Sequence, residues 1–135
     1  MKFKEDCIFC KIANKRIPAE IIKETDGFIV IKDINPVAPI HLLIISKSHY
    51  DSVLDAGCKG AEGKSGGNAH NGDMEGADAG IGKELFGILG SLADKFNVAD
   101  TGFRTVINTK EDGGQTVNHL HIHFMAGRGF GWPPG

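Results

Sequence analysis

Three histidines that alternate with apolar residues limit how one segment of this chain can fold. The segment is 119–125, with the sequence His-Leu-His-Ile-His-Phe-Met. Side chains of a β-strand alternate between two faces, so His119, His121 and His123 would share one face and the residues between them the other. The pattern predicts a strand with an apolar back that can be buried. Its front carries three imidazoles suited to phosphate chemistry or to metal binding.

A turn with two glycines precedes this strand. The sequence Gly113-Gly114-Gln115-Thr116 can direct backbone N–H groups toward an anion. Removing three adjacent imidazoles from water costs free energy, which disfavours a purely structural role for the row. Histidines two residues apart on a strand can also chelate one ion, so a catalytic zinc held by His119, His121 and His123 is one alternative.

Length and composition exclude several classes of protein. The 135 residues suffice for one domain with a modest core, so we expect a single domain over 1–135. The net charge of −2 gives no reason to expect a nucleic-acid or membrane partner. The first residues lack the apolar stretch of a signal peptide, which predicts a cytoplasmic protein. Three cysteines, an odd number, argue against a disulfide framework.

Cys7 and Cys10 form a Cys-x-x-Cys pair near the start of the chain. No thioredoxin-like strand precedes the pair, so metal binding is favoured over redox chemistry. A tetrahedral structural zinc needs two further ligands, normally histidine or cysteine. A pair of reduced thiols without an ion remains the alternative.

The remaining patterns predict helices, strands and one insertion. Segment 8–16 has the pattern of a short helix with Ile8, Phe9 and Ile12 on one face, and segment 83–97 that of a longer amphipathic helix. The expected strands are a segment around 21–22 joined to 28–33 by a turn at 26–27, then 40–45, 103–109 and the histidine strand. Segment 56–80, which is rich in glycine and poor in apolar residues, predicts a flexible insertion in which Cys58 and His70 are incidental.

The histidine pattern resembles the signature of the histidine triad (HIT) family of nucleotide hydrolases and transferases. The resemblance also covers 6–12, 17–19, 33–39, His41, 46–49 and 103–135, so that only about residues 56–80 lie outside it. The terminal Trp132-Pro133-Pro134-Gly135 is similar to the Hint branch, the nucleoside phosphoramidases. Thr116 and Asn118 depart from the Hint pattern, which usually has serine and an aromatic residue at these positions.

The resemblance implies an α+β fold. In this fold a roughly five-stranded antiparallel sheet carries one short and one long helix, and two sheets join across a homodimer. The long helix would lie at the dimer interface, where Gly87 and Gly90 would allow a second element to approach closely.

The resemblance also assigns roles to individual residues. His121 would be the nucleophile, with His123, His41 and Thr116 as further catalytic groups. Contacts to a purine nucleotide are implied for Ile8, Phe9, Ile12, Ile31, Asp33, Ile34, Leu43, Asn108, Gly114, Gln115, Thr116, His121 and His123. A structural zinc would be held by Cys7, Cys10, His49 and His119, and catalysis itself would need no cofactor.

The implied function is hydrolysis of purine nucleoside phosphoramidates, such as adenosine 5′-monophosphoramidate, through a nucleotidyl-histidine intermediate. One alternative is hydrolysis of dinucleoside polyphosphates, as in the Fhit branch. Another is a nucleotide- or zinc-binding interaction module in which catalysis is incidental. The products formed from diadenosine substrates distinguish the first two, and weak turnover with tight AMP binding would favour the third.

Overall fold

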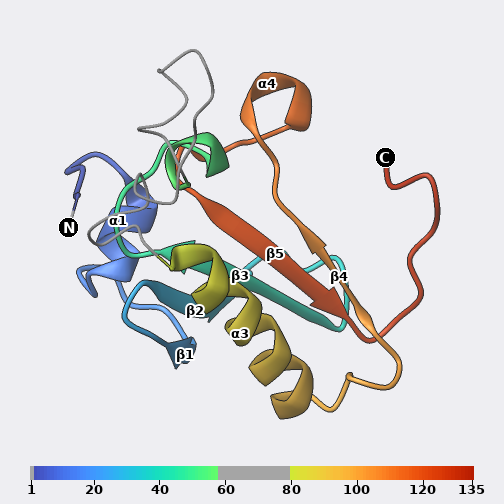
Figure 1. The fold of residues 1–135 in the computed structure, drawn as a ribbon. Helices are drawn as coiled ribbons and strands as arrows, with labels where there is room; N and C mark the ends of the chain where they lie inside the picture. Colours follow the sequence, from blue (N-terminus) through green and yellow to red (C-terminus); the bar gives the residue numbers. More distant parts are fainter. Residues whose placement is uncertain (1, 58–79) are drawn as a thin grey trace.

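The computed structural model describes residues 2–57 and 80–135 (Figure 1). Most of the predicted insertion 56–80, including Cys58 and His70, lies outside the described residues. The elements are α1 (Ile8–Ala13), β1 (Ile21–Glu24), β2 (Phe28–Lys32), β3 (Ile40–Ser46), a 3-10 turn η1 (Val53–Asp55), α3 (Ile81–Lys95), β4 (Phe103–Val106), α4 (Lys110–Gly113) and β5 (His121–Ala126). No helix among these described residues is long and apolar enough to cross a membrane.

The described strands form one five-stranded antiparallel sheet in the order β1-β2-β3-β5-β4. The predicted α+β fold and the predicted hairpin at 26–27 are therefore confirmed. β3 and β5 lie in the centre, with Leu43 opposite His123 and Ile45 opposite His121. This register places the histidine strand beside the most apolar strand of the chain.

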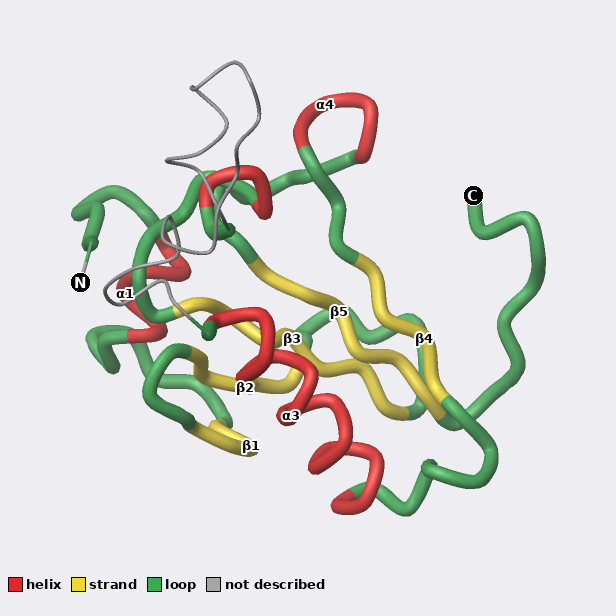
Figure 2. Tube along the Cα trace, in the orientation of Figure 1, coloured by secondary structure: helices red, strands yellow, loops and turns green. Residues whose placement is uncertain are grey.

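The sheet separates two apolar clusters, as the period-two pattern requires. One face carries the back of β5 (Leu120, Ile122 and Phe124) and is covered by Ile88 and Leu92 of α3. The ribbon shows α3 running across this face of the sheet (Figures 1 and 2). The opposite face is smaller, and it joins Cys7, Phe9, Cys10 and Ala13 around α1 to Ile29, Ile31, Leu43 and Ile45 of the sheet. The histidines project on this smaller face.

A carboxylate ties α3 to the β1–β2 hairpin. Glu84 Oε2 accepts a hydrogen bond from the Thr25 hydroxyl and another, of 2.8 Å, from the backbone N–H of Gly27. The Cβ of any residue larger than glycine at position 27 would lie 2.9 Å from Glu84 Oε1. Gly27 therefore serves both the turn and the close approach of the helix.

The first helix differs from its prediction in length and in its buried face. α1 ends at Ala13 rather than at residue 16, because Asn14 caps it and Lys15 has a left-handed backbone with φ of 62°. Its buried positions are Phe9, Cys10 and Ala13, whereas Ile8 is 50% exposed. The predicted stripe of Ile8, Phe9 and Ile12 is thus core only in part: Phe9 is buried and Ile12 is half-buried, whereas Ile8 lies on the surface.

Other predicted boundaries shift by a few residues. The long helix begins at Ile81 and ends at Lys95 instead of spanning 83–97. β4 ends at Val106, and Thr109 is the N-cap of the short helix α4, in a segment predicted to be a loop. A Cβ at Gly87 or Gly90 would meet no described atom within 4 Å. The close packing predicted from these glycines is therefore absent among the described residues of the protomer.

Candidate functional site

The candidate site lies on the face of the sheet that α1 covers. β5 supplies His121 and His123, and β3 supplies His41, which lies diagonally opposite His123 across the ladder. Phe9 of α1 contacts the edge of His121, with ring centroids 5.0 Å apart. The central strands therefore fix the backbone of each histidine, and α1 shields one side of the row.

The hydrogen bonds of His121 determine which nitrogen carries its proton. Its Nδ1 lies 2.7 Å from the carbonyl oxygen of His119, which can only accept. Nδ1 is therefore the protonated nitrogen, and Nε2 keeps a free lone pair. The residue is only 6% exposed, so the surrounding protein holds the ring in one orientation. A buried imidazole in this state is suited to attack an electrophile from Nε2.

A chain of hydrogen bonds likewise sets the tautomers of His41 and His123. The backbone N–H of Val37 donates to His41 Nδ1 at 3.1 Å, so the proton of neutral His41 is on Nε2. His41 Nε2 lies 2.9 Å from His123 Nδ1 and donates to it. His123 consequently carries its own proton on Nε2. His123 therefore presents an N–H donor next to the His121 ring, which has its lone pair on Nε2. The centroids of the two rings are 5.3 Å apart.

His123 is neutral as well as correctly oriented. Burial lowers its pKa from the ordinary value of 6.5, and the neighbouring His121 and His41 lower it further, while the Asp33 carboxylate raises it. Asp33 Oδ2 lies 3.3 Å from His41 Nε2, and Asp33 Oδ1 accepts a hydrogen bond from the backbone N–H of Asn35 at 2.8 Å. The carboxylate is thereby held at the edge of the histidine row.

Asp33, His41 and His123 are also close enough to share an ion, because their donor atoms lie within 4.8 Å of one another. The tautomers argue against this arrangement. His41 Nε2 carries the proton that the Val37 amide forces away from Nδ1, so it offers no lone pair to a metal. The three groups are better described as a hydrogen-bonded unit.

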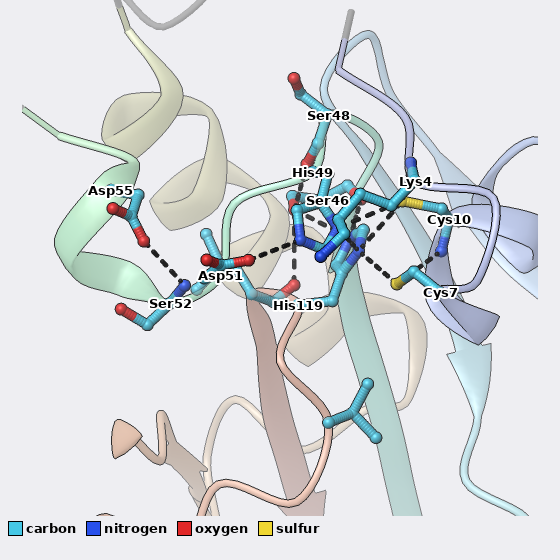
Figure 3. A network of polar contacts seen from close by, with 12 residues as sticks. Lys4, Cys7, Cys10, Ser46, Ser48, His49, Asp51, Ser52, Asp55 and His119 are labelled. Atoms are coloured by element: carbon cyan, nitrogen blue, oxygen red, sulfur yellow. Dashed lines mark hydrogen bonds and ion pairs between the residues drawn. The ribbon is translucent and has the colours of Figure 1, made fainter.

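A second cluster at the base of α1 brings together all four predicted zinc ligands (Figure 3). Cys7 Sγ and Cys10 Sγ lie 3.3 and 3.5 Å from His119 Nδ1, and Cys10 Sγ lies 3.3 Å from His49 Nδ1. The two Nδ1 atoms are 3.1 Å apart. Each of the four residues is buried. By contrast, the described groups that could share an ion do not include a set of His119, His121 and His123.

The geometry of this cluster fits a tetrahedral zinc ion. Ligand atoms around such an ion lie about 3.3–3.8 Å from one another, given bond lengths of about 2.0–2.3 Å. His119 Nε2 donates to the carbonyl oxygen of Ser46 at 2.7 Å, and His49 Nε2 donates to Asp51 Oδ1 at the same distance. Both Nδ1 lone pairs then face each other, an arrangement that a cation between them stabilises. Figure 3 shows the rings converging on the cysteines.

The protonation states of the cluster depend on burial. Burial lowers the pKa of His119 to about 4, so its ring is neutral at pH 7, as a metal ligand must be. Burial raises the pKa of the Cys10 thiol to about 11 in the absence of a cation. Metal binding at this cluster would therefore release the thiol proton, and its affinity would increase with pH.

The residues expected to contact a nucleotide base divide into two groups. Phe9, Ile31 and Leu43 are buried in one apolar cluster, and Ile12 packs against it. Ile8 and Ile34 lie on the surface, with Ile34 90% exposed. The apolar cluster thus presents a wall next to Asp33.

The residues expected to contact phosphate lie on the loop before β5. Gly114 adopts φ of 77° and ends α4, so the predicted turn forms there. The Gln115 side chain is used within the protein: its amide donates to the carbonyl oxygens of Asp51 and Val117, and Oε1 accepts from the N–H of Lys110. The side chain therefore fixes the loop and leaves only the backbone of Gln115 for a ligand.

The two remaining residues, Asn108 and Thr116, lie before and after α4. Thr116 is exposed and lines a cavity together with Ile8 and Cys7. Asn108 lies between β4 and α4 and is partly buried. No contact of either side chain with a catalytic histidine occurs among the hydrogen bonds described above.

Three functional groups were missed by sequence reasoning. The Val37 N–H and the Ser46 carbonyl orient His41 and His119, and any residue supplies such backbone groups, so the sequence carried no signal for them. Asp51 orients His49 from two residues away, and a carboxylate so close to a predicted metal ligand was a usable signal.

Comparisons with known proteins agree with this geometry. A family model described as HIT domain matches residues 14–130. Protein HitA from Neisseria gonorrhoeae is 40% identical over 121 residues, which cover 90% of this chain and 95% of that protein. A 14 kDa zinc-binding protein from Brassica juncea is 35% identical over 96% of this chain and 100% of its own.

A solved structure shares the fold. The HIT family hydrolase from Legionella pneumophila Philadelphia 1 aligns with a TM-score of 0.77 and 34% identity, over 96% of this chain and 100% of that chain. The likeness extends over nearly the whole length of both proteins.

Proposed function

The chain belongs to the HIT family, and from this premise we propose that it is a hydrolase of purine nucleoside phosphoramidates. The observation that carries the proposal is the hydrogen bond from His121 Nδ1 to the carbonyl oxygen of His119, because it leaves Nε2 unprotonated for attack on phosphorus. Phe9, Ile31 and Leu43 would form an apolar wall for the base. Asp33 would accept hydrogen bonds from the ribose hydroxyls.

The first step is attack of His121 Nε2 on the phosphorus of the substrate. A phosphorus–nitrogen bond to the histidine forms while the bond to the leaving amine breaks. The amine leaves as a neutral molecule only if it gains a proton, which His123 would donate from Nε2. The backbone N–H of Gly114 and the hydroxyl of Thr116 are proposed to stabilise charge on the phosphoryl oxygens.

The second step is hydrolysis of the nucleotidyl-histidine. Water attacks phosphorus, and its proton passes to His123 Nε2, which lost one in the first step. The bond to His121 breaks, releasing the nucleoside monophosphate and restoring the lone pair. Splitting one difficult displacement into two easier ones is the advantage of a covalent intermediate.

We assign the zinc to a structural role. Cys7, Cys10, His49 and His119 would hold it with four protein ligands, which leaves no open coordination position for substrate. The name of the Brassica juncea relative, a zinc-binding protein, supports this assignment. The ion would fix α1 against the ends of β3 and β5, and so hold Phe9 against His121.

The C-terminal Trp132-Pro133-Pro134-Gly135 supports the Hint branch over the Fhit branch. Hydrolysis of dinucleoside polyphosphates is the second candidate, since the same attack at phosphorus would serve it. A phosphoramidase releases ammonia from adenosine 5′-monophosphoramidate and leaves diadenosine substrates largely intact.

The test is hydrolysis of adenosine 5′-monophosphoramidate by the wild type and by His121→Ala. Loss of the nucleophile should lower kcat/KM by about a thousandfold or more. His49→Gln, which would disturb the metal cluster but keep the nucleophile, is the comparison that separates loss of chemistry from loss of structure. Equal activity of the wild type and His121→Ala would remove His121 as nucleophile. A wild type that binds AMP but cleaves neither substrate would favour a binding module.

A further inference from the structure

The loop between β2 and β3 controls the proton arrangement of the site through one backbone group. Val37 lies in this loop, and its N–H is the donor to His41 Nδ1 at 3.1 Å. Without this donor, the proton of His41 could move to Nδ1, and Nε2 would become an acceptor. His123 would then donate from Nδ1 and lose its proton on Nε2. The Asp33 carboxylate, 3.3 Å from His41 Nε2, favours the same tautomer, so the Val37 amide acts together with Asp33 in making His123 a donor toward the substrate.

Contacts from the segment after β5 hold this loop in place. Arg128 Nε donates to the carbonyl oxygen of Val37 at 3.1 Å, across 91 residues of sequence. Gly127, immediately before it, has φ of 97°, and a Cβ there would lie 2.8 Å from Cβ of Pro39. The loop that contains Val37 and Pro39 therefore rests directly on Gly127 and Arg128.

The Arg128 side chain is itself fixed although the residue is exposed. Its guanidinium carbon lies 4.2 Å from the centre of the Phe130 ring, and a guanidinium N–H donates to the carbonyl oxygen of Gly129 at 2.8 Å. Arg104 of β4 lies 5.2 Å from the same ring and donates to the carbonyl oxygen of Gly131 at 2.9 Å. The two arginines share these contacts, and of the two only Arg128 has a hydrogen bond to Val37 among those described.

We propose that Arg128 is a positioning residue that sets the tautomers of His41 and His123 through Val37. The planar guanidinium is suited to this, because it donates in two directions at once and stacks on Phe130. Its hydrogen bond to the Val37 carbonyl keeps the amide of the same residue directed at His41. The consequence for catalysis rests on the proposed function, whereas the consequence for the tautomers does not.

The direct test is the tautomer of each histidine, measured by NMR on the full-length protein labelled with ¹⁵N in the imidazoles. Arg128→Met keeps an apolar stem over Phe130 but removes every donor. Arg104→Met is the matched control, since Arg104 shares the Phe130 ring but has no bond to Val37. We expect the Nε2–H tautomer for His41 and His123 in the wild type and in Arg104→Met, and a mixture or the Nδ1–H tautomer in Arg128→Met. Unchanged tautomers in Arg128→Met would overturn the proposal.

Kinetics provide a second readout that a purely structural role would not produce. With adenosine 5′-monophosphoramidate, Arg128→Met should lower kcat by about tenfold with little change in KM, because the donor for the leaving amine is mispositioned. With adenosine 5′-phosphorofluoridate the loss should be small, because fluoride leaves without a proton. An equal loss on both substrates would contradict the proposal. If the wild type cleaves neither, the proposed function fails while the NMR comparison still decides the role of Arg128.

Gly127→Ala offers an independent variant that retains Arg128. The added Cβ would clash with the Pro39 side chain and displace the β2–β3 loop. We expect the same change in the His41 tautomer as in Arg128→Met. A folded Gly127→Ala protein with the wild-type tautomers would show that the contact between Gly127 and the β2–β3 loop does not control the tautomers of His41 and His123.

Discussion

At the scale of single residues, the site depends on which nitrogen of each imidazole carries a proton. His121 is unprotonated at Nε2 because the carbonyl of His119 takes its Nδ1–H, and His123 is protonated at Nε2 because His41 donates to its Nδ1. Histidines two residues apart on one strand thus present opposite groups, a lone pair on His121 and an N–H on His123, and under the proposed mechanism they would have opposite functions. The difference arises entirely from their hydrogen-bond partners, since their chemistry is the same.

The opposite functions predict a dependence on the leaving group. His123→Ala should lower kcat about a hundredfold on adenosine 5′-monophosphoramidate, because the amine loses its proton donor. On adenosine 5′-phosphorofluoridate the kcat of His123→Ala should fall much less. His121→Ala should lose activity on both substrates. Steady-state rates with the two substrates measure this, and equal losses for His123→Ala would argue against a role as general acid.

A second residue-scale prediction concerns stability and pH. Burial lowers the pKa of His123 below 6.5, so in acid the unfolded chain binds a proton that folded His123 resists. The contribution of His123 to the free energy of unfolding is therefore complete above pH 6.5 and is lost as the pH falls below it. The free energy of unfolding, measured with urea, should fall more between pH 7.5 and pH 5 for the wild type than for His123→Asn. Identical drops would mean that His123 is not buried in its neutral form.

At the scale of elements, α1 depends on the cysteine–histidine cluster. A helix of 6 residues is too short to be stable by itself, and its buried face consists of Phe9, Cys10 and Ala13. The cluster joins this helix to the ends of β3 and β5, which lie far away in the sequence. Metal binding and the position of Phe9 over His121 are consequently coupled.

This coupling predicts the effect of losing the metal. Purified protein should contain about one zinc per chain, and Cys10→Ser should lose the zinc and several kcal/mol of unfolding free energy, since metal binding stabilises only the folded state. Metal analysis and urea unfolding measure the two effects. The matched control is Cys58→Ser, which alters the third cysteine. Full zinc content in Cys10→Ser would contradict the assignment of this ligand.

At the scale of the whole molecule, α3 and β4 each expose an aromatic side chain. Phe86 of α3 is 73% exposed, and its neighbour Gly87 has no described atom near the position of a Cβ. β4 is an edge strand of the sheet, and its Phe103 is 39% exposed. We propose that a second copy covers this region in a homodimer of the single domain formed by residues 1–135, which joins the two sheets.

The homodimer predicts a specific change in mass. The wild type should elute with twice the chain mass in size-exclusion chromatography with light scattering. Phe86→Glu should shift it toward the monomer, because a carboxylate would replace an aromatic ring at the interface. Lys95→Glu, an exposed change in the last turn of the same helix, nine residues from Phe86, should leave the dimer intact. A monomeric wild type at micromolar concentration would refute the dimer.

The periodicity of the sequence by itself determined the two-faced strand and the buried central strand, whereas the antiparallel sheet and the set of zinc ligands followed only from the resemblance to the HIT family. Alternation of histidines with Leu120 and Ile122 requires one apolar face, and the run 40–45 requires a buried partner strand. These are local consequences of side-chain periodicity, which each segment carries on its own. The burial of Cys10 was not among them, because its partners His49 and His119 lie far away in the sequence.

The tertiary structure alone decided which nitrogen of each imidazole carries a proton. The groups responsible are the carbonyls of His119 and Ser46 and the amide of Val37, and no side-chain pattern encodes the direction of a backbone group. Arg128 reaches Val37 across 91 residues, a contact that periodicity cannot reveal. Residue types are properties of the chain, whereas proton positions depend on neighbours that only folding brings together.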